Sequence, residues 1–596
     1  MKKCLALLMA GLLCLSLAAC GNQNSTSSPD PAVTSLTDGT YTGTAAGHNG
    51  KINVEVTVEE GKLNTIRVLE EDETAGIGDL AIQTLVEKMN QSQSTQVDLV
   101  SAATISSAGV VNAVRNALKE AGADDAYFKN ESKVSLDKAE MEDNYDYDVV
   151  IVGGGGAGLT AAIEAANNGA HVAVLEKTPA VGGNTLVSGG GLNAPGTQHQ
   201  LAKGIEDSVE KFAEDTYNSG DQEANRELVE VMAENALDAT NWLIDDIHVE
   251  FMPDRLQQFG GHSVPRALIP VGNHGDELIF KLRDAAEAAG VDILCNVKGE
   301  EILMNEGRAS GIRAAYDGQQ ITFNAAKGVI LATGGFASNV EMRKQYNANY
   351  DERFKTTARA ISTGDGIRMA EEVGASLVDM EFIQVYPTCN PITGIISYVA
   401  NSRMDGGLLL NKEGVRFVDE MGRRDVISNA ILDQTDQIGY LVWGQEIENI
   451  GHMTEVHAVE FQNWIDNDLL YVADTLEEAA NHFGLDAQAM IKTIEAYNES
   501  IRDGLDEDFN KTSSLQPVAV GPFYIQKVVP SSHHTMGGVQ INTRTEVISA
   551  EGQVIPGLYA AGEVVGDIHG TNRLGGNAIT DCVVFGRIAG QNASAE

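Results

Sequence analysis

Two histidines and an arginine near the C-terminal end of this chain belong to the residue types that bind organic anions. His533 and His534 are adjacent in the segment HHTMGG, and Arg573 follows in the glycine-rich segment AAGEVVGDIHGTNRLGGNA. A guanidinium group binds a carboxylate through two parallel hydrogen bonds, and imidazoles beside it complete an anion clamp. The neighbouring glycines let the backbone approach a flat ring system closely. These segments therefore predict a carboxylate site beside a planar group.

A nucleotide-binding unit far upstream has to position this site. Val149–Val152 has the composition of a buried parallel strand, a helix is expected to about Asn168, and a strand over His171–Leu175 ends at Glu176. The fingerprint glycines between them are Gly153, Gly155 and Gly158. They allow a tight turn, the approach of a pyrophosphate and helix packing, while the acid binds ribose hydroxyls. The pattern predicts a Rossmann-like α/β domain for FAD or NAD. Combined with a carboxylate clamp, it favours a flavoenzyme acting on an organic acid.

A smaller α+β domain is expected before this unit, over residues 38–124. Lys51–Val58 and Leu63–Leu69 alternate apolar and polar residues around a glycine turn, which predicts a hairpin. A helix is expected over Gly78–Met89, followed by an amphipathic helix that carries Val110 and Leu118 on one face. The charged residues 125–144 predict a linker.

The composition limits the possible partners. A formal net charge of −44 argues against nucleic acid and against electrostatic docking on anionic lipid, so an anionic ligand needs a local positive pocket. Cys295, Cys389 and Cys582 show neither metal-ligand spacing nor a disulfide framework. We therefore expect no metal site.

The first residues predict an export signal. Lys2 and Lys3 precede the apolar run Leu5–Leu17, which is typical of a signal peptide over residues 1–19. Residues 20–37 are polar and proline-containing, as in a flexible tether. No later apolar run reaches the length of a membrane span, so we expect the body to lie outside the cytoplasm. Leu-Ala-Ala-Cys resembles the bacterial lipobox, which implies a lipid on Cys20 and anchoring to the cell membrane of a bacterium.

The N-terminal domain resembles a known flavin-binding family. TAGIGDLAIQTLVEKM followed by VSAATISS is similar to the small FMN-binding domain whose S-G-A-T-x-[ST] motif carries FMN through a phosphoester. The resemblance implies covalent FMN at Thr104, ahead of a helix N-terminus that suits a phosphate. Ala102 departs from the motif, which has glycine there. The alternative is an ordinary helix start with Ser106 or Ser107 as the N-cap.

The remaining chain, from about Asp146 to Gln591, resembles the flavoproteins of the fumarate reductase and succinate dehydrogenase type, in the soluble flavocytochrome c form that includes urocanate reductases. The segments VGGNTLVSGGGLNAPG, GVILATGGFASN, TGDGIRMAEEVGA and VIPGLYAAGEVVG carry the likeness. It implies non-covalent FAD in a domain over 145–378 and 525–596, with an α+β capping domain inserted at 379–524. The FAD residues so implied are Gly153, Gly155, Ala157, Gly158, Glu176, Lys177, Asn184, Thr185, Gly189, Gly190, Gly191, Thr333, Gly334, Asp365, His533, Glu563, Ala578 and Ile579.

The same resemblance assigns catalytic roles. It makes Arg573 the carboxylate clamp with His534 beside it, and Arg424 the proton donor supported by Arg403. The implied reaction is hydride transfer from reduced FAD to the β-carbon of an α,β-unsaturated acid, and we expect electrons to pass from a membrane donor to FMN and then to FAD. Because Ala400 stands where the family has a proton-carrying glutamate, water or another acid such as Asp405 has to reload Arg424.

Departures from the family pattern narrow the substrate. Tyr386 stands where fumarate enzymes have a histidine, and Val399-Ala400 stands where they have Thr-Glu, so a second carboxylate would be poorly paired. A phenol beside an apolar wall suits a flat ring, and urocanate reductases have this tyrosine. Asn401 occupies the place of their acid, so urocanate and arylacrylates both remain candidates. Gln384 and Gly576 complete the expected substrate site. A fumarate reductase, a reverse-running oxidase or dehydrogenase, and an electron-carrying lipoprotein are the alternatives.

Overall fold

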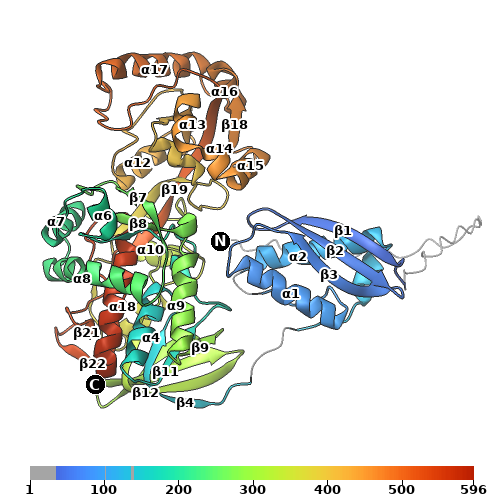
Figure 1. Cartoon of the computed structure of the whole chain (residues 1–596), viewed down its shortest axis with the longest axis vertical. Coiled ribbons are helices and arrows are strands. Elements are labelled where there is room, and N and C mark those ends of the chain that lie inside the picture. The colour runs from blue at the N-terminus through green and yellow to red at the C-terminus, as the bar shows by residue number, and fades with distance from the viewer. Residues whose placement is uncertain (1–34, 101–102, 136–139, 596) are drawn as a thin grey trace, which may run out of the picture.

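The computed structural model describes residues 35–100, 103–135 and 140–595. The expected signal peptide, Cys20, most of the tether and Ala102 lie outside the described residues. Figure 1 shows a small N-terminal domain beside a large body, with a third part stacked on one end of the body.

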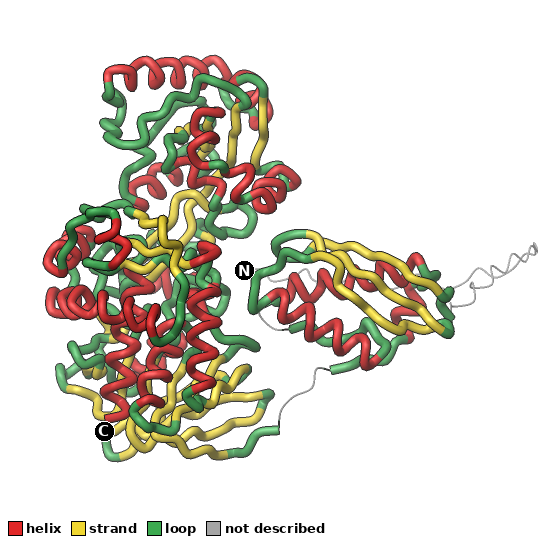
Figure 2. Tube along the Cα trace, viewed as in Figure 1, coloured by secondary structure: helices red, strands yellow, loops and turns green. Residues whose placement is uncertain are grey.

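The small domain is a three-stranded antiparallel sheet covered by two helices. The strands are β1 (Gly39–Ala46), β2 (Lys51–Glu59) and β3 (Lys62–Glu70), in this order, and the helices are α1 (Gly78–Ser92) and α2 (Thr104–Glu120). Alternate residues of β2 are fully buried, as the sequence pattern predicts for a sheet covered on one face. Figure 2 shows both helices packed along this sheet.

The small domain extends beyond the expected boundary. Residues Asp125–Asn130 form helix α3, and the Asp124 carboxylate caps it by accepting a hydrogen bond from the backbone N–H of Tyr127 at 2.7 Å. Phe128 is buried in the core of the small domain, and Val97 pairs with Val134. The first part of the segment expected as a linker is therefore folded. Its one buried aromatic ring, that of Phe128, packs into the core of the small domain and holds the charged stretch against it.

The body contains a largely parallel eight-stranded sheet. Its central strands are β12 (Gln319–Leu331), β4 (Asn144–Val152), β5 (Val172–Glu176) and β9 (Asp292–Cys295), adjacent in this order and parallel. β22 (Val554–Ala560) also pairs with β12 in parallel, while β10 (Lys298–Asn305), β11 (Arg308–Tyr316) and β21 (Glu546–Ile548) are antiparallel additions. Residues 149–152 of β4 are buried, as expected of a strand covered on both faces.

Helices cover this sheet and connect its strands. α4 (Gly156–Asn167) follows the fingerprint turn and packs against α9 (Asp276–Ala288) and α18 (Asn577–Ala595), and α18 also packs against α8 (Arg226–Asp245). The mixed α/β fold expected from the sequence, with a Rossmann-like domain and a separate small domain before it, is confirmed.

The third part, called the cap below, is built on a second sheet with its own core. β19 (Phe523–Thr535) is its central strand, and the sheet also contains β13 (Lys355–Thr356), β15 (Ile383–Cys389), β16 (Leu408–Leu410), β17 (Gly439–Trp443) and β18 (Leu470–Ala473). The cap core contains Trp443 and residues between 399 and 528. Helices around it are α12 (Arg424–Leu432), α13 (Gln445–Gly451), α14 (Met453–Val456), α15 (Ala458–Asp466), α16 (Leu476–Phe483) and α17 (Ala487–Ser500).

Shorter elements complete the fold. They are α5 (Gly183–Leu186), β6 (Leu192–Asn193), α6 (Gln198–Ala202), α7 (Val209–Ser219), β7 (Phe251–Gln257), β8 (Ala267–Pro270), α10 (Val340–Tyr346), α11 (Asp365–Glu372), β14 (Leu377–Val378) and β20 (Gly538–Val539), with 3-10 turns at Val271–Asn273, Val399–Arg403 and Ile501–Asp503. Within the part of the chain that the structure describes, no helix combines the length and apolarity needed to cross a membrane.

Candidate active site

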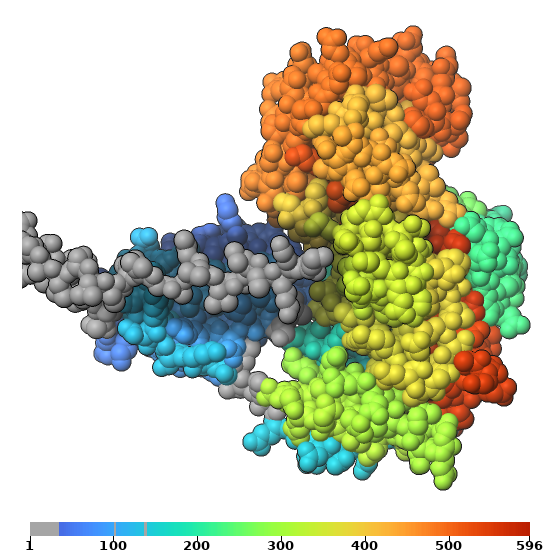
Figure 3. Space-filling model, turned by 180° about the vertical axis from the view of Figure 1, so that it is seen from behind, coloured from blue at the N-terminus to red at the C-terminus, as the bar shows by residue number. Residues whose placement is uncertain are grey.

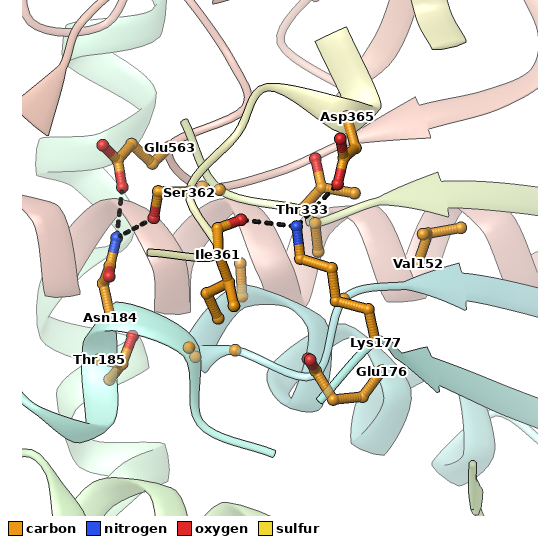
Figure 4. Close-up of a pocket in the computed structure, with 18 of the residues that line it drawn as sticks. Val152, Glu176, Lys177, Asn184, Thr185, Thr333, Ile361, Ser362, Asp365 and Glu563 are labelled. Atoms are coloured by element: carbon orange, nitrogen blue, oxygen red, sulfur yellow. Dashed lines mark hydrogen bonds and ion pairs between the residues drawn. The ribbon is translucent and has the colours of Figure 1, made fainter. Parts of the chain in front are cut away.

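A cavity opens where the carboxyl ends of β4, β5 and β12 meet, the position at which open α/β sheets bind nucleotides. Eleven of the predicted FAD residues line it, namely Gly153, Gly155, Ala157, Glu176, Lys177, Asn184, Thr185, Thr333, Gly334, Asp365 and Glu563. Figure 4 shows several of them around this space.

The glycines of the cavity fit a bound dinucleotide. A β-carbon on Gly153, where φ is +106°, would lie 2.3 Å from the carbonyl oxygen of Ala332, so only glycine permits this close turn. A β-carbon on Gly158 would lie 1.9 Å from the Gly153 oxygen, which fixes the packing of α4 on the turn. Gly334 faces open space instead, and the buried hydroxyl of neighbouring Thr333 has no hydrogen-bond partner within the described part of the chain. A phosphate or ribose of FAD would satisfy that hydroxyl.

The acidic and basic residues at one end of the cavity are held in place by each other. Oε2 of Glu176 accepts from the Gly154 N–H at 2.9 Å, and Oε1 accepts from both the N–H and the hydroxyl of Thr178, which leaves a lone pair on Oε2 for a ribose hydroxyl. Lys177 pairs with Asp365 at 2.7 Å and also donates to the Ile361 carbonyl, as Figure 4 shows. The Lys177 ammonium and the nearby Thr363 hydroxyl help hold the pKa of Asp365 below its usual range, against the opposing effect of burial.

At the other end, Asn184 and Glu563 connect the cavity to the histidine segment. Asn184 donates to the Ser362 hydroxyl at 2.9 Å and to Glu563 at 3.4 Å. The other oxygen of Glu563 accepts the backbone N–H of Thr535 at 3.1 Å. Burial raises the pKa of Glu563, although the Thr535 N–H and the Arg573 charge oppose the rise. The end of β19, with His533 and His534, is therefore tied directly to the cofactor cavity.

Arg424 and Arg573 converge on one amide oxygen although 149 residues separate them in the sequence. Oε1 of buried Gln384 accepts from Arg573 at 3.0 Å and from Arg424 at 3.4 Å. The Gln384 amide nitrogen donates to the Arg573 carbonyl and to Asn572, which fixes the orientation of the side chain. Nε of Arg573 is buried and has no hydrogen-bond partner among the described residues. The oxygen of Gln384 thus marks a point that two cations share, and the Arg573 guanidinium keeps one donor available.

Aromatic groups complete this cluster. The guanidinium of Arg424 lies over the Tyr386 ring, 4.9 Å from its centroid, and the Tyr386 ring lies 5.6 Å from that of His533. The His533 ring nitrogen Nδ1 shares a hydrogen bond with the Thr357 hydroxyl at 2.7 Å, while Nδ1 of buried His534 has no hydrogen-bond partner in the residues that the structure describes. Asn401 and Arg403 lie on the 3-10 turn Val399–Arg403, and Arg403 is buried and donates to the Glu420 carbonyl.

The electrostatics of the cluster favour an anion. Burial, reinforced by Arg573, holds the pKa values of His533 and His534 well below the usual range, so both imidazoles are neutral. Burial and the nearby Arg424 lower the pKa of Arg573 to about 9, which still leaves it charged at neutral pH. Burial also lowers the pKa of Arg424, with Arg403 contributing. The site therefore concentrates positive charge in a strongly acidic protein.

Other predicted residues lie apart from the cavity lining. Gly189–Gly191, Ala578 and Ile579 are not among the described residues that line it. Gly576, with φ at +86°, packs against the buried side chain of Asn193. Thr104 is the first residue of α2 and is exposed. The helix starts before Ser106 and Ser107, and their hydroxyls bond Glu73 and the Val100 N–H instead, so neither serine is the N-cap.

Several lining residues were not predicted from the sequence. They are Val152, Gly156, Leu175, Gly183, Lys298, Gly299, Ala332, Ile361, Ser362, Ala561, Gly562 and Cys582. Most are neighbours of predicted residues. Gly183 lies in the run VGGN, which belongs to a segment that resembles the FAD-binding family and could have been used to predict it. Lys298 and Gly299 come from β10, whose sequence carries no nucleotide-binding motif.

Comparisons with known proteins agree with this architecture. A family model described as FAD binding domain matches residues 148–579, and one described as FMN-binding domain matches residues 47–119. The chain is 42% identical to the urocanate reductase of Eggerthella lenta over 585 residues, which covers 98% of this chain and 96% of that protein. It is 38% identical to a fumarate reductase (cytochrome) of Shewanella frigidimarina, covering 78% of this chain and 80% of that one.

A solved structure gives the same result. The open conformation of a flavocytochrome c3 fumarate reductase superposes with a TM-score of 0.67 at 36% identity, covering 76% of this chain and 78% of that one. The fold and site define a flavoprotein oxidoreductase with FAD and FMN as cofactors. The chain belongs to the FAD-dependent family that contains the urocanate and fumarate reductases, which confirms the resemblance seen in its sequence.

Proposed function

We propose that this protein reduces the C=C bond of a ring-bearing α,β-unsaturated carboxylate, either urocanate or an arylacrylate. The observation that carries the proposal is the convergence of Arg424 and Arg573 on a single oxygen of Gln384, with the Arg424 guanidinium over the ring of Tyr386. Two cations around one oxygen position suit a carboxylate, and a phenol ring beside them suits a planar substituent.

The chain's own residues bind and orient the acid. Arg573 presents its free Nε and its Nη2 as a fork for the carboxylate, and charge that develops there is stabilised by these donors. Bound FAD in its reduced form supplies the hydride for the β-carbon. Arg424, whose pKa is lowered by burial, gives the proton to the α-carbon, so that one C=C bond is replaced by two C–H bonds. Neutral His534 donates or accepts a hydrogen bond without adding charge.

Two residues next to Asn401 disfavour fumarate. Val399 and Ala400 stand where the family pattern has donors to a second carboxylate, but both are buried and apolar, so such a charge would be unpaired and costly. Asn401 lies on the same turn and can accept from or donate to a ring substituent, but cannot pair with a charged imidazole. The 42% identity to a urocanate reductase supports urocanate, whereas the amide at residue 401 supports an uncharged aryl ring.

The cellular setting belongs to the same proposal. The sequence supports export and lipid attachment at Cys20, which would hold the enzyme on the outer face of the cell membrane of a bacterium. FMN at Thr104 would receive electrons from a membrane donor and pass them on to FAD. The exposed Thr104 hydroxyl at the N-terminus of the 17-residue helix α2 gives a phosphoester access and a favourable helix dipole.

Substrate specificity can be measured with the flavin-loaded protein. Reduced methyl viologen is supplied, and its reoxidation is followed with urocanate, cinnamate, caffeate, acrylate, crotonate and fumarate. We expect rapid turnover with one ring-bearing acid and near-background rates with fumarate. Fast fumarate reduction would contradict the proposed pocket. If both flavins cycle but none of the acids is reduced, the electron-carrier or reverse-reaction alternative is favoured.

A further inference from the structure

The small domain touches the body at a few specific points. Nδ2 of Asn463, on α15 of the cap, donates to the backbone carbonyl of Asn49 at 3.1 Å. Gly76 lies so close to the body that a β-carbon there would be 2.9 Å from the Phe280 ring and 3.6 Å from Leu186. The neighbouring Ile77 packs against the cores of both domains. Figures 1 and 3 show the small domain at the side of the body with one end turned towards it.

Glu73 connects these contact points to the start of the helix that carries the proposed flavin attachment residue. One oxygen of buried Glu73 accepts the backbone N–H groups of His48 and Asn49 at 2.7 and 3.1 Å, and the other accepts the hydroxyl of Ser106. Glu73 therefore ties the β1–β2 loop and the turn before α1 to the first turn of α2, which begins at Thr104. The end of the domain that contacts the body is the end that carries Thr104.

The receiving surface belongs to the FAD site. Leu186 is the last residue of α5, and Asn184 and Thr185 of the same helix line the FAD cavity. Phe280 lies on α9, which packs directly on α5. Asn463 adds a contact from the cap. The small domain thus meets the FAD domain next to residues that line the cavity, and it meets the cap at Asn463.

We infer that Asn49, Gly76 and Ile77 form a docking face through which the FMN-binding domain presents its flavin end to a surface formed by Leu186, Phe280 and Asn463. This inference rests on the proposed attachment of FMN at Thr104. Docking lets two electrons leave reduced FMN and enter oxidised FAD within the same chain, with reduced viologen as the electron source in vitro.

The interface has the character of a reversible contact. Among the described residues, no helix or strand of the small domain packs extensively against an element of the body. Interfaces of this size between domains of one chain permit relative motion. The domain can therefore leave the docked position to meet an external donor and return to deliver electrons. Because Asn463 belongs to the cap, the position of the cap affects the stability of docking.

Two substitutions test the docking face from opposite sides. Ile77→Asp places a carboxylate between the cores of the two domains, next to Gly76, which lies against Phe280, and Asp is a favourable residue type at the N-cap position that Ile77 occupies in α1. Asn463→Asp replaces the donor to the Asn49 carbonyl by an acceptor without changing the size of the side chain. The matched controls are Leu80→Asp, at a residue 41% exposed on α1, and Asn449→Asp, which keeps its role as acceptor from Gln445 on the cap.

The measurements are FMN-to-FAD electron transfer by stopped-flow spectroscopy and hydrogen exchange of α5 and α9 in the flavin-loaded full chain. We expect both test variants to slow electron transfer about tenfold or more. Ile77→Asp buries an unpaired charge in the docked state, and Asn463→Asp removes the hydrogen-bond donor to Asn49. We also expect faster exchange at α5 and α9, while both controls match the wild type. Each variant is first checked for flavin content and melting temperature.

The results separate docking from the proposed substrate. Unchanged exchange and unchanged transfer in both test variants would overturn the docking face. Faster exchange with unchanged transfer would overturn its role in electron delivery. If both quantities change as expected but no unsaturated acid is reduced, the docking face stands and the proposed substrate class is wrong.

Discussion

Replacing Arg573 by lysine tests the carboxylate clamp most directly. In the structure, Nη1 of Arg573 is anchored on the Leu574 carbonyl at 2.9 Å, Nη2 donates to Gln384 at 3.0 Å, and Nε has no partner. Lysine keeps the positive charge but has one nitrogen, so it cannot hold the anchor and form two parallel bonds to a carboxylate. The variant therefore loses one charge-assisted hydrogen bond at the developing charge.

The expected magnitude follows from that single bond. A hydrogen bond to a charged group contributes about 1.5–3 kcal/mol, so kcat/KM for the best acid should fall roughly 10- to 150-fold. The dissociation constant of the saturated product, measured by perturbation of the flavin spectrum, should rise by a smaller factor, because the clamp acts most strongly on the transition state. FAD content should stay unchanged.

A matched control separates this effect from a general loss of stability. Arg587 on α18 is also largely buried and pairs with Glu164 at 2.6 Å, but it contacts neither Gln384 nor Arg424. Arg587→Lys should therefore leave kcat/KM within about threefold of the wild type. A threefold change corresponds to less than about 1 kcal/mol, the free energy that a weak ion pair contributes. A rate for Arg573→Lys within the same threefold range would refute the clamp, and so would equal losses in both variants.

Three further changes have defined outcomes. Tyr386→His should reduce turnover of ring-bearing acids more than that of acrylate in the viologen assay, because the aromatic wall under Arg424 is smaller; equal losses on all acids would contradict a role in selectivity. Burial raises the pKa of Asp379 to about 7, above its unfolded value, so its carboxyl destabilises the fold increasingly as pH rises from about 4 to 7. The melting temperature of Asp379→Asn should therefore exceed that of the wild type by a difference that grows with pH over this range. At its largest, this difference corresponds to about 1 kcal/mol of unfolding free energy after solvent screening; a difference that does not change with pH would refute this assignment. Arg416→Met leaves buried Glu420 and Asp506 without their shared cation, and should lower the unfolding free energy by about 3–5 kcal/mol in calorimetry; a loss below 1 kcal/mol would show that the network is not needed.

Local sequence patterns predict the cofactor cavity well. The fingerprint glycines and Glu176 lie within one strand-turn-helix-strand unit, so their spacing alone determines where they meet. Lys298 and Gly299 line the same cavity from β10. The consecutive hairpins β10–β11–β12 reach the cavity only because β12 pairs with β4, a strand far upstream in the chain. No sequence pattern encodes that pairing. Gly190, which belongs to a run expected to cover FAD, instead turns against Pro270.

Contacts between distant segments also form the substrate cluster, and the sequence alone does not predict them. The residue types were predicted from the sequence with the family resemblance, but the shared oxygen of Gln384 between Arg424 and Arg573 appears only when three distant segments are folded together. The folded start of the segment after residue 124 was missed because its charge pattern conceals the single buried ring of Phe128. Contact between the FMN-binding domain and the FAD site depends on single residues from separate domains, which leave no periodic signal.

The division of the clamp between two parts of the molecule has a consequence for how acids are captured. Arg573 belongs to the FAD domain, whereas Arg424 and Tyr386 belong to the cap, and β19 runs without a loop from the centre of the cap to His533 and His534. A movement of the cap relative to the FAD domain would separate the two arginines and shift the histidines with it. Under the proposed function, binding of the acid and closure over the flavin would then be one event. Opening of the cap would release the product without breaking each contact in turn.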